Sequence, residues 1–188
     1  MEVKFLESTL DIFKTNRLTI KEVSGINIEN LSSILSDETT MRYTATGAQN
    51  HEQMVEFIKN CERQYRENGF SHWAIFITET NELIGLCGLN KHLVDGEEHV
   101  HVNYRLGSKY LGKGFATEAV SGVKKYCSAF LSIKYLSAII EPSNNDSIKV
   151  VERLGFKLIK QTVFKSLNVN VYQTSVPVLP STEVCLDI

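Results

Sequence analysis

Cysteine is scarce in this sequence, and the few cysteines are not arranged in a motif. Cys61, Cys87, Cys127 and Cys185 lie far apart, with no C-x-x-C pair among them. This spacing argues against a zinc knuckle and against a disulfide framework. Cys61, Cys87 and Cys127 fall on apolar positions of the pattern, so we expect them to be ordinary core residues.

Long apolar runs and clusters of basic charge are also missing. The opening stretch MEVKFLESTLDIF carries three acidic residues where a secretory signal would need an uninterrupted apolar run, and no other segment approaches the length of a membrane span. The formal net charge is -2, and Lys and Arg are scattered along the chain rather than gathered in a stripe. We therefore expect a cytoplasmic protein with a small-molecule ligand and with no nucleic-acid or membrane partner.

No Ser/Gly/Pro-rich linker and no internal repeat divides the chain. Its 188 residues, 43% of them hydrophobic, are enough for one sizeable core. We predict a single domain over residues 1–188, with a core at about 15–176. Residues 177–188 contain two of the three prolines and have no clear period. They are predicted to be a tail or a partner-contacting extension.

The periods of the apolar residues predict a mixed α/β sheet with the order β-α-α-β-β-β-α-β-α-β-β. Strands are expected at 17–23, 72–78, 83–90, 99–106, 133–140, 156–164 and 168–176. Helices are expected at 26–35, from Asn50 to Asn68, from about Gly114 and just before Gly155. In the second helix Asn50 can cap and Gln53 can reach back to it. The third helix has an apolar face made of Ala116, Ala119, Val120, Val123, Cys127 and Phe130.

The stretch YLGKGFATEA, residues 110–119, places two glycines between a predicted strand and a predicted helix. The first N–H groups of a helix are unpaired and carry the positive end of its dipole, so such a turn can bind an anion. Gly112 and Gly114 would allow a ligand to approach the backbone closely. The alternative is that these glycines only allow the chain to turn.

One possible anion is a nucleoside triphosphate, because GSKYLGKG reproduces most of the G-x-x-x-x-G-K-[ST] phosphate loop. Gly114 stands where the loop needs a hydroxyl for magnesium. The preceding strand has His and Asn on one face, unlike the buried parallel strand that leads into a phosphate loop. Both departures argue against nucleotide hydrolysis.

The other possible anion is the pyrophosphate of coenzyme A, and here the sequence resembles a known family. LGKGFA, residues 111–116, is similar to the R/Q-x-x-G-x-G/A signature of the GNAT superfamily of acyl-CoA-dependent N-acyltransferases, with Leu111 in its first place. EPSNNDSIKVVERLGF, residues 141–156, resembles the P-x-N-x-x-S segment and short helix of the ribosomal-protein N-terminal acetyltransferase branch. TNRLTIKEV and SDETTMRY resemble the start of that branch. The resemblance covers about residues 15–176, and two separated motifs in the right structural context are more specific than the glycine turn alone.

The resemblance implies where acetyl-CoA binds. Its pantetheine arm would lie between the strand that ends at Leu106 and the strand that ends near Ile140. Asn144 would hydrogen-bond this arm and Ser147 would stand near the thioester sulfur, although Asn144 could also simply cap the short helix and Ser147 be an ordinary first-turn residue. The pyrophosphate would be held by backbone amides, with Lys113 adding charge, at Gly112, Lys113, Gly114, Phe115, Ala116 and Thr117.

Acetyl transfer to an amine needs a proton acceptor and a proton donor. His99, His101, Asn103 and Arg105 alternate on one face of the 99–106 strand. Relatives often have a glutamate at the place of His101, so His101 is the candidate base, with a pKa nearer neutrality. The alternatives are that both histidines face solvent on an edge strand, or that they bind a metal, for which no third ligand is apparent.

The leaving thiolate needs a proton donor. Many family members use a tyrosine four residues before the glycine of the short helix, and Val151 stands at that place here. Ser147 or a water molecule then takes this role.

Together these features predict an acetyl-CoA-dependent N-acetyltransferase that needs no metal and acts as a monomer or homodimer. The acceptor is an amine, either a small molecule or a protein N-terminus. The alternative from another class is a non-catalytic acyl-CoA-binding or regulatory module, consistent with the missing tyrosine.

Overall fold

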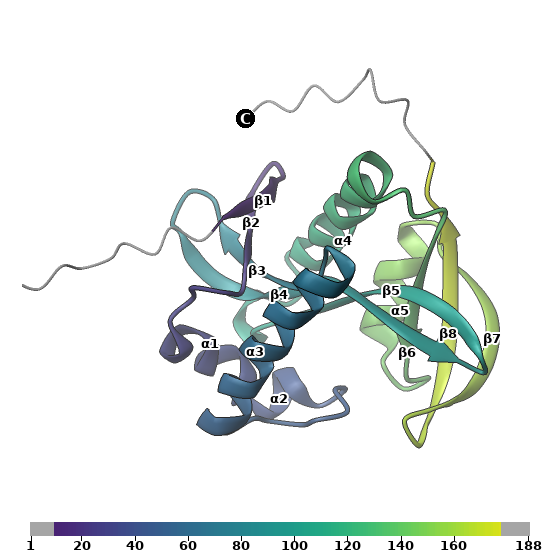
Figure 1. The fold of residues 1–188 in the computed structure, drawn as a ribbon, viewed down its shortest axis with the longest axis horizontal. Helices are drawn as coiled ribbons and strands as arrows, with labels where there is room; N and C mark the ends of the chain where they lie inside the picture. Colours follow the sequence, from purple (N-terminus) through teal and green to yellow (C-terminus); the bar gives the residue numbers. More distant parts are fainter. Residues whose placement is uncertain (1–9, 178–188) are drawn as a thin grey trace, which may run out of the picture.

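The computed structural model describes residues 10–177, which build an eight-stranded mixed sheet with helices packed on both of its faces (Figure 1). The strands are β1 (Asp11–Lys14), β2 (Leu18–Glu22), β3 (His72–Ile77), β4 (Glu82–Val94), β5 (Glu97–Leu106), β6 (Tyr135–Ile140), β7 (Lys157–Phe164) and β8 (Leu167–Ser175). The α-helices are α1 (Ile28–Leu35), α2 (Glu38–Met41), α3 (His51–Asn68), α4 (Phe115–Tyr126) and α5 (Asn145–Arg153). The predicted mixed α/β class is therefore confirmed.

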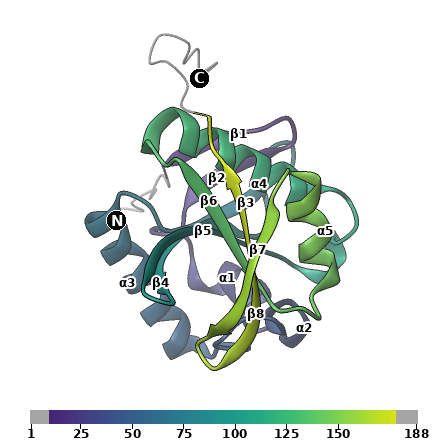
Figure 2. The same cartoon turned by 90° about the vertical axis from the view of Figure 1, so that its right-hand side faces the viewer.

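The strands follow the order β1-β2-β3-β4-β5-β6-β8-β7 across the sheet. All neighbours are antiparallel except β5 and β6, which are parallel. In Figure 1, β1–β3 and α1–α3 lie in the left part of the molecule, β6–β8 with α5 lie in the right part, and β4 and β5 run between the two parts. Figure 2, turned by 90°, shows β6, β7 and β8 fanning out beside β5. The one parallel junction thus joins the two parts of the sheet.

Each face of the sheet has its own apolar core. One cluster packs α4 against β2–β6, with Trp73, Val120 and Leu136 fully buried. The other packs α1 and α3 against the opposite face, where Leu31 and Leu86 are fully buried. Burying such side chains is the main favourable contribution to folding, at roughly 1.5–3 kcal/mol each.

Local signals in the sequence placed α3 and the core cysteines correctly. Asn50 accepts a hydrogen bond from the Gln53 backbone N–H, and the Gln53 side chain accepts one from the Asn50 N–H, both at 2.9 Å. Gly69 ends the helix with a φ of 77°. Cys61, Cys87 and Cys127 are free and buried, as predicted, whereas Cys185 lies outside the described residues.

Other expectations need correction. The sheet begins with β1, which the sequence patterns did not predict, and the four-residue helix α2 was also missed. Phe130 was expected on the buried face of α4 but is 46% exposed. The reason is a π-helical turn over Cys127–Leu131, which changes the helical period after Tyr126. Residues 178–188 of the predicted tail lie outside the described residues.

No helix within residues 10–177 combines the length and the apolar character needed to cross a membrane.

Candidate functional site

The candidate site lies where the parallel strands β5 and β6 separate. A single residue pair, His101 with Ser137, joins the two strands, and the side chains of His99 and Ser137 contact each other there at 2.9 Å. Beyond this junction β5 continues to Leu106 and β6 to Ile140 without further pairing. The carboxyl-terminal ends of these two parallel strands are therefore not paired with each other, and we call the place between them the opening.

The opening is lined by backbone groups of β5 that have no partner strand. The N–H of Gly107 donates to the Ile84 carbonyl of β4 at 2.9 Å. Because peptide groups alternate in direction along a strand, those of Tyr104 and Leu106 point the other way, toward the side of β6. An extended ligand can therefore pair with β5 here in the manner of an added strand.

The glycine turn follows β5 in the chain and leads into α4. Gly112 and Gly114 both have positive φ, at 73° and 81°, which is a conformation that L-residues rarely adopt. Among the described residues 10–177, no side chain caps the N-terminus of α4 at Gly114, and a Cβ added at Gly112 would meet no atom within 4 Å. The first N–H groups of α4 thus have the arrangement that the predicted anion site requires, and the binding of an anion there stays a prediction.

A long-range network holds this turn in place. The Arg17 side chain donates to Glu118 at 2.7 Å and to the Lys113 carbonyl at 3.1 Å, and it lies over the Phe115 ring at 4.5 Å. Thr15 donates to the same carboxylate at 2.6 Å. Burial is the largest single influence on the pKa of Glu118 and raises it. The hydrogen bonds from Thr15 and Arg17 together outweigh burial, so the pKa of Glu118 is lowered. The segment between β1 and β2 therefore fixes the first turn of α4.

The start of α5 forms the β6 side of the opening. The Oδ1 of Asn144 accepts a hydrogen bond from the Ser147 N–H at 3.2 Å. Asn144 therefore caps α5, as one of the two interpretations of the sequence expected. The hydroxyl of Tyr104 in β5 donates to the Ser147 carbonyl at 2.9 Å. Val151, at the place of the expected tyrosine, is fully buried. The tyrosine that lies close to Ser147 is thus Tyr104 of β5, and not a residue of α5.

A row of polar side chains occupies the face of β3–β5 that α1–α3 cover. Alternation places His72, Asn103 and Arg105 on this face, together with His99 and His101. Arg105 reaches the Met41 sulfur of α2 at 3.3 Å and the His72 ring at 3.4 Å. His99 and His101 are only 6% and 8% exposed. The alternative of solvent-facing histidines on an edge strand is therefore wrong, because β5 lies inside the sheet.

The expectation of a near-neutral pKa for His101 is also wrong. Burial, with the charges of His92 and Lys165, lowers the pKa of His101 to about 3. His92 Nδ1 lies 2.9 Å from His101 Nε2, and its own pKa is lowered by burial and by Lys165. The pKa of Arg105 is lowered to about 10, mainly by burial. His101 is accordingly a neutral imidazole at pH 7.

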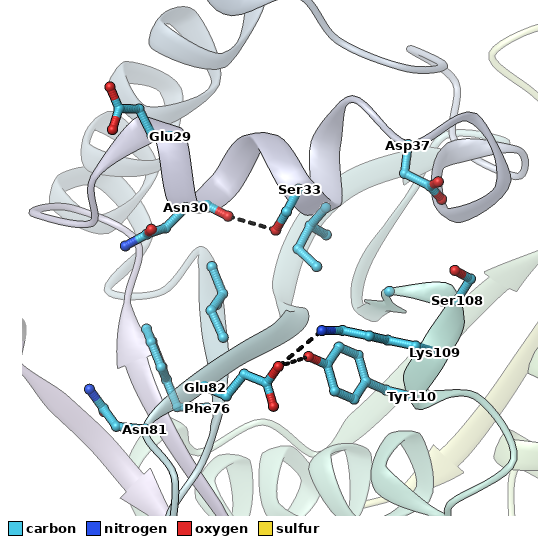
Figure 3. A pocket seen from close by; sticks show the side chains of 13 residues that line it. Glu29, Asn30, Ser33, Asp37, Phe76, Asn81, Glu82, Ser108, Lys109 and Tyr110 are labelled. Atoms are coloured by element: carbon cyan, nitrogen blue, oxygen red, sulfur yellow. Dashed lines mark hydrogen bonds and ion pairs between the residues drawn. The ribbon is translucent and has the colours of Figure 1, made fainter.

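A separate cavity of about 560 Å³ lies between α1, the hairpin of β3 and β4, and the short turn Ser108–Tyr110 (Figure 3). Glu82 projects into it and accepts hydrogen bonds from Lys109 and Tyr110. None of the residues predicted to bind coenzyme A lines this cavity. It is therefore distinct from the opening between β5 and β6.

Nothing in residues 10–177 groups three or more His, Cys, Asp or Glu side chains so that they could hold a metal ion.

Comparisons with known proteins agree with this architecture. Residues 17–157 match the family model described as an acetyltransferase (GNAT) domain. An uncharacterized N-acetyltransferase, p20 of Bacillus licheniformis, is 31% identical over 153 residues, which cover 79% of this chain and 83% of that protein. The chain belongs to the GNAT acetyltransferase family. The predicted family and the predicted enzyme class, an acetyltransferase, are both confirmed.

Two further matches involve ribosomal-protein acetyltransferases. The ribosomal protein uS5 alanine N-acetyltransferase of Escherichia coli is 27% identical over 94 residues, which are 50% of this chain and 48% of that protein. A solved structure of RimL, a ribosomal-protein alpha-N-acetyltransferase in complex with coenzyme A, superposes with a TM-score of 0.75. It is 14% identical, and the match covers 90% of this chain and 99% of that one. The fold is thus shared with an enzyme whose structure contains coenzyme A.

Sequence patterns missed several residues around the site. Arg17, His92 and Tyr104 make the contacts described above, although no local motif marks them. Alternation along the 99–106 strand already placed Asn103 beside His101 and so contained a signal for it. Arg17 and Tyr104 depend on partners far apart in the chain, and His92 depends on the pairing of β4 with β5.

Proposed function

We propose that this protein transfers the acetyl group of acetyl-CoA to a primary amine by direct attack in a ternary complex. It would act in the cytoplasm as a monomer or homodimer. The observation that carries the proposal is that β5 ends without a partner on the side of β6 and is followed by the N-terminus of α4, which no side chain of residues 10–177 caps. An anion and an extended arm, the two parts of coenzyme A, fit these two features.

The residues at the glycine turn suit a pyrophosphate. Backbone amides from Gly112 to Thr117 would surround it, including those of Lys113, Gly114, Phe115 and Ala116. Gly112–Gly114 are exposed, and the positive φ of Gly112 and Gly114 favours glycine, which has no side chain to cover the backbone. Lys113 and the helix dipole add positive potential.

The pantetheine arm would lie along β5 toward the junction with β6. Peptide groups of Leu106 and Tyr104 are suitably directed to bond it. The Oδ1 of Asn144 is used in the cap of α5, so we assign the Asn144 Nδ2 as the donor to the arm. Ser147, in the first turn of α5, is the proposed proton donor to the leaving thiolate, directly or through water.

His101 is the proposed acceptor of the amine proton. With a pKa of about 3 it cannot deprotonate an alkylammonium before attack. We therefore infer that the acceptor binds as the neutral amine. Its N–H becomes more acidic as the nitrogen bonds to the thioester carbon, and a weak base then suffices. The contact with His92 gives this proton a route toward the surface.

Two measurements test the proposal. Acetyl-CoA is expected to raise the thermal midpoint of unfolding, because it binds the folded state alone. Release of free thiol from acetyl-CoA in a panel of amines separates an enzyme from a non-catalytic acyl-CoA-binding module. A midpoint that responds to millimolar ATP with magnesium but not to acetyl-CoA would contradict the proposal. Binding without thiol release for any amine would favour the binding module.

A further inference from the structure

We propose that Arg17 is a positioning residue for the coenzyme. Together with Glu118, it holds the glycine turn in the form that the pyrophosphate of acetyl-CoA needs before the ligand arrives. Arg17 acts through these contacts and does not touch the reacting atoms. The inference rests on the proposed function, and it adds a residue that lies far in the chain from the glycine turn and from α5.

The first observation is that the segment before β2 surrounds the carboxylate of Glu118. The Arg17 Nε donates to its Oε2 at 2.7 Å. The Arg17 backbone N–H, at 2.7 Å, and the Thr15 hydroxyl, at 2.6 Å, both donate to its Oε1. Hydrogen bonds to an ionised group are roughly twice as strong as those between neutral groups. Three donors of one short segment therefore fix the position of Glu118, and with it the first turn of α4.

The second observation is that the same guanidinium bonds to the glycine turn itself. Its Nη1 donates to the Lys113 carbonyl at 3.1 Å. This carbonyl and the Gly114 N–H belong to one planar peptide group, so the bond that orients the carbonyl also orients the N–H. A Cβ added at Gly114 would lie 3.5 Å from the Arg17 Nη2, and the guanidinium lies 4.5 Å above the Phe115 ring. Arg17 thus lies against three consecutive residues of the proposed pyrophosphate site.

The third observation is that the turn needs such a tie. Gly112 and Gly114 both have positive φ, and glycine can adopt many other conformations at little cost. If the ligand had to order this turn, the lost conformational entropy would weaken its binding. Because Arg17 already holds the turn in the folded protein, the ligand meets an ordered site.

The charge of Glu118 gives Arg17 a second effect on the ligand. Glu118 lies in the first turn of α4, where a negative charge is favourable for the helix. The same charge repels a pyrophosphate that binds at this helix N-terminus. The guanidinium pairs with the carboxylate and so offsets the repulsion. Removing Arg17 alone should therefore harm binding more than removing both charges, and the two substitutions should not be additive.

The test measures the Kd of acetyl-CoA by titration of the full-length protein. Arg17→Ala should raise this Kd about tenfold or more, which corresponds to about 1.4 kcal/mol. Adding Glu118→Gln to Arg17→Ala should recover part of the affinity, because no unpaired carboxylate then remains beside the ligand. Arg17→Lys keeps the charge but lacks the planar fork that reaches both Glu118 and the Lys113 carbonyl. Its Kd should lie between those of the wild type and Arg17→Ala, and it carries the test where Arg17→Ala does not fold.

A second readout needs no ligand. Amide hydrogen exchange reports local opening of the backbone. In ligand-free Arg17→Ala, the amides of residues 112–117 should exchange faster than in the wild type, while those of β3 in the centre of the sheet should keep their rates. Faster exchange throughout the sheet with an unchanged Kd would show that Arg17 only stabilises the fold.

Turnover measurements locate the loss at the pyrophosphate. At saturating acetyl-CoA, kcat and the KM of the amine should stay near their wild-type values in Arg17→Ala. S-acetylpantetheine has the thioester but no pyrophosphate, so its kcat/KM should not change. Lys91→Ala is the matched control, because it removes another ion pair, Lys91 with Glu98 at 2.8 Å, on the β4–β5 hairpin. It should leave the Kd of acetyl-CoA unchanged.

The failures of the two proposals are distinguishable. A wild-type protein that shows no acetyl-CoA shift and no thiol release with any amine would overturn the proposed function. A wild-type protein that binds acetyl-CoA, with a Kd that stays within twofold in Arg17→Ala and Arg17→Lys, would overturn the present inference alone. An equal loss with acetyl-CoA and S-acetylpantetheine would also overturn it.

Discussion

The hydroxyl of Tyr104 in β5 donates a 2.9 Å hydrogen bond to the carbonyl of Ser147 in α5. These residues come from opposite sides of the opening between β5 and β6. The bond is buried enough that desolvation raises the pKa of Tyr104. It therefore fixes the separation of the two walls of the proposed coenzyme A site.

Removing this bond tests whether it sets the width of the opening. Tyr104→Phe leaves the Ser147 carbonyl without its donor and should lower the free energy of unfolding by about 1 kcal/mol. It should also weaken acetyl-CoA binding, because α5 loses its tie to β5. Denaturant unfolding and acetyl-CoA titration measure the two effects. Tyr135→Phe, at a tyrosine that is 60% exposed, should change neither quantity.

The glycine turn can be tested with two matched substitutions. Gly112 and Gly69 have φ values of 73° and 77°, and an added Cβ meets no atom within 4 Å at either position. Alanine at either position should lower the free energy of unfolding by a similar amount, roughly 1–2 kcal/mol, because of backbone strain. Only Gly112→Ala should also weaken acetyl-CoA binding, because its methyl group would occupy the proposed pyrophosphate site. Equal acetyl-CoA affinity in the two folded variants would show that the turn is only structural.

The buried state of His101 predicts the pH dependence of stability. Its pKa is lowered from 6.5 to about 3 on folding, so the unfolded chain binds more protons below pH 6.5. Stability should therefore fall as the pH drops through this window, by at most about 1.4 kcal/mol per pH unit from this group. His72 and His92, whose pKa values are also lowered, add slopes of the same sign.

The contribution of His101 can be isolated by a variant. His101→Gln should flatten the dependence of unfolding free energy on pH between 5 and 6.5, where few carboxylates titrate. His51→Gln, at an exposed position in α3, is the control and should keep the wild-type slope. An unchanged slope in His101→Gln would show that His101 is not held neutral by the fold.

The pH dependence of catalysis should follow the acceptor. Because the pKa of His101 is about 3, kcat/KM should show no limb from His101 between pH 6 and 8. A limb in this range should move when an amine of different pKa is used. His101→Ala should lower kcat/KM by roughly 10²-fold without moving the limb. A limb that stays fixed for two amines and disappears in His101→Ala would contradict the neutral-amine mechanism.

The role of Ser147 is tested by separating kcat from affinity. If its hydroxyl protonates the thiolate, Ser147→Ala should lower kcat and leave acetyl-CoA affinity nearly unchanged. The backbone bonds of Ser147 to Asn144 and Tyr104 do not involve the hydroxyl, so stability should change little. Full turnover in Ser147→Ala would assign the proton to water.

The local part of the site could be predicted from the sequence. Two glycines before an apolar helical period indicate a helix N-terminus at Gly114, since only a few residues tolerate positive φ and the helix signal follows at once. The capping box of Asn50 and Gln53 could also be predicted, because the two residues that bond lie three positions apart in the chain. Alternation placed His101, Asn103 and Arg105 on one face. Each of these features depends on neighbours in the chain.

The tertiary structure decided what these residues can do. The pKa of His101 depends on the burial of β5 inside the sheet and on His92 of β4, and no property of the 99–106 segment contains that information. Arg17 and Glu118 are 101 positions apart, and Tyr104 and Ser147 are 43 apart. The sequence by itself determined where most of the strands and helices begin and where the glycine turn lies, although it did not predict β1 or α2. The separation of β5 from β6, the burial of the polar face and the partners of each side chain arise only when distant segments pack, because desolvation and hydrogen bonding act between groups that the chain order does not bring together.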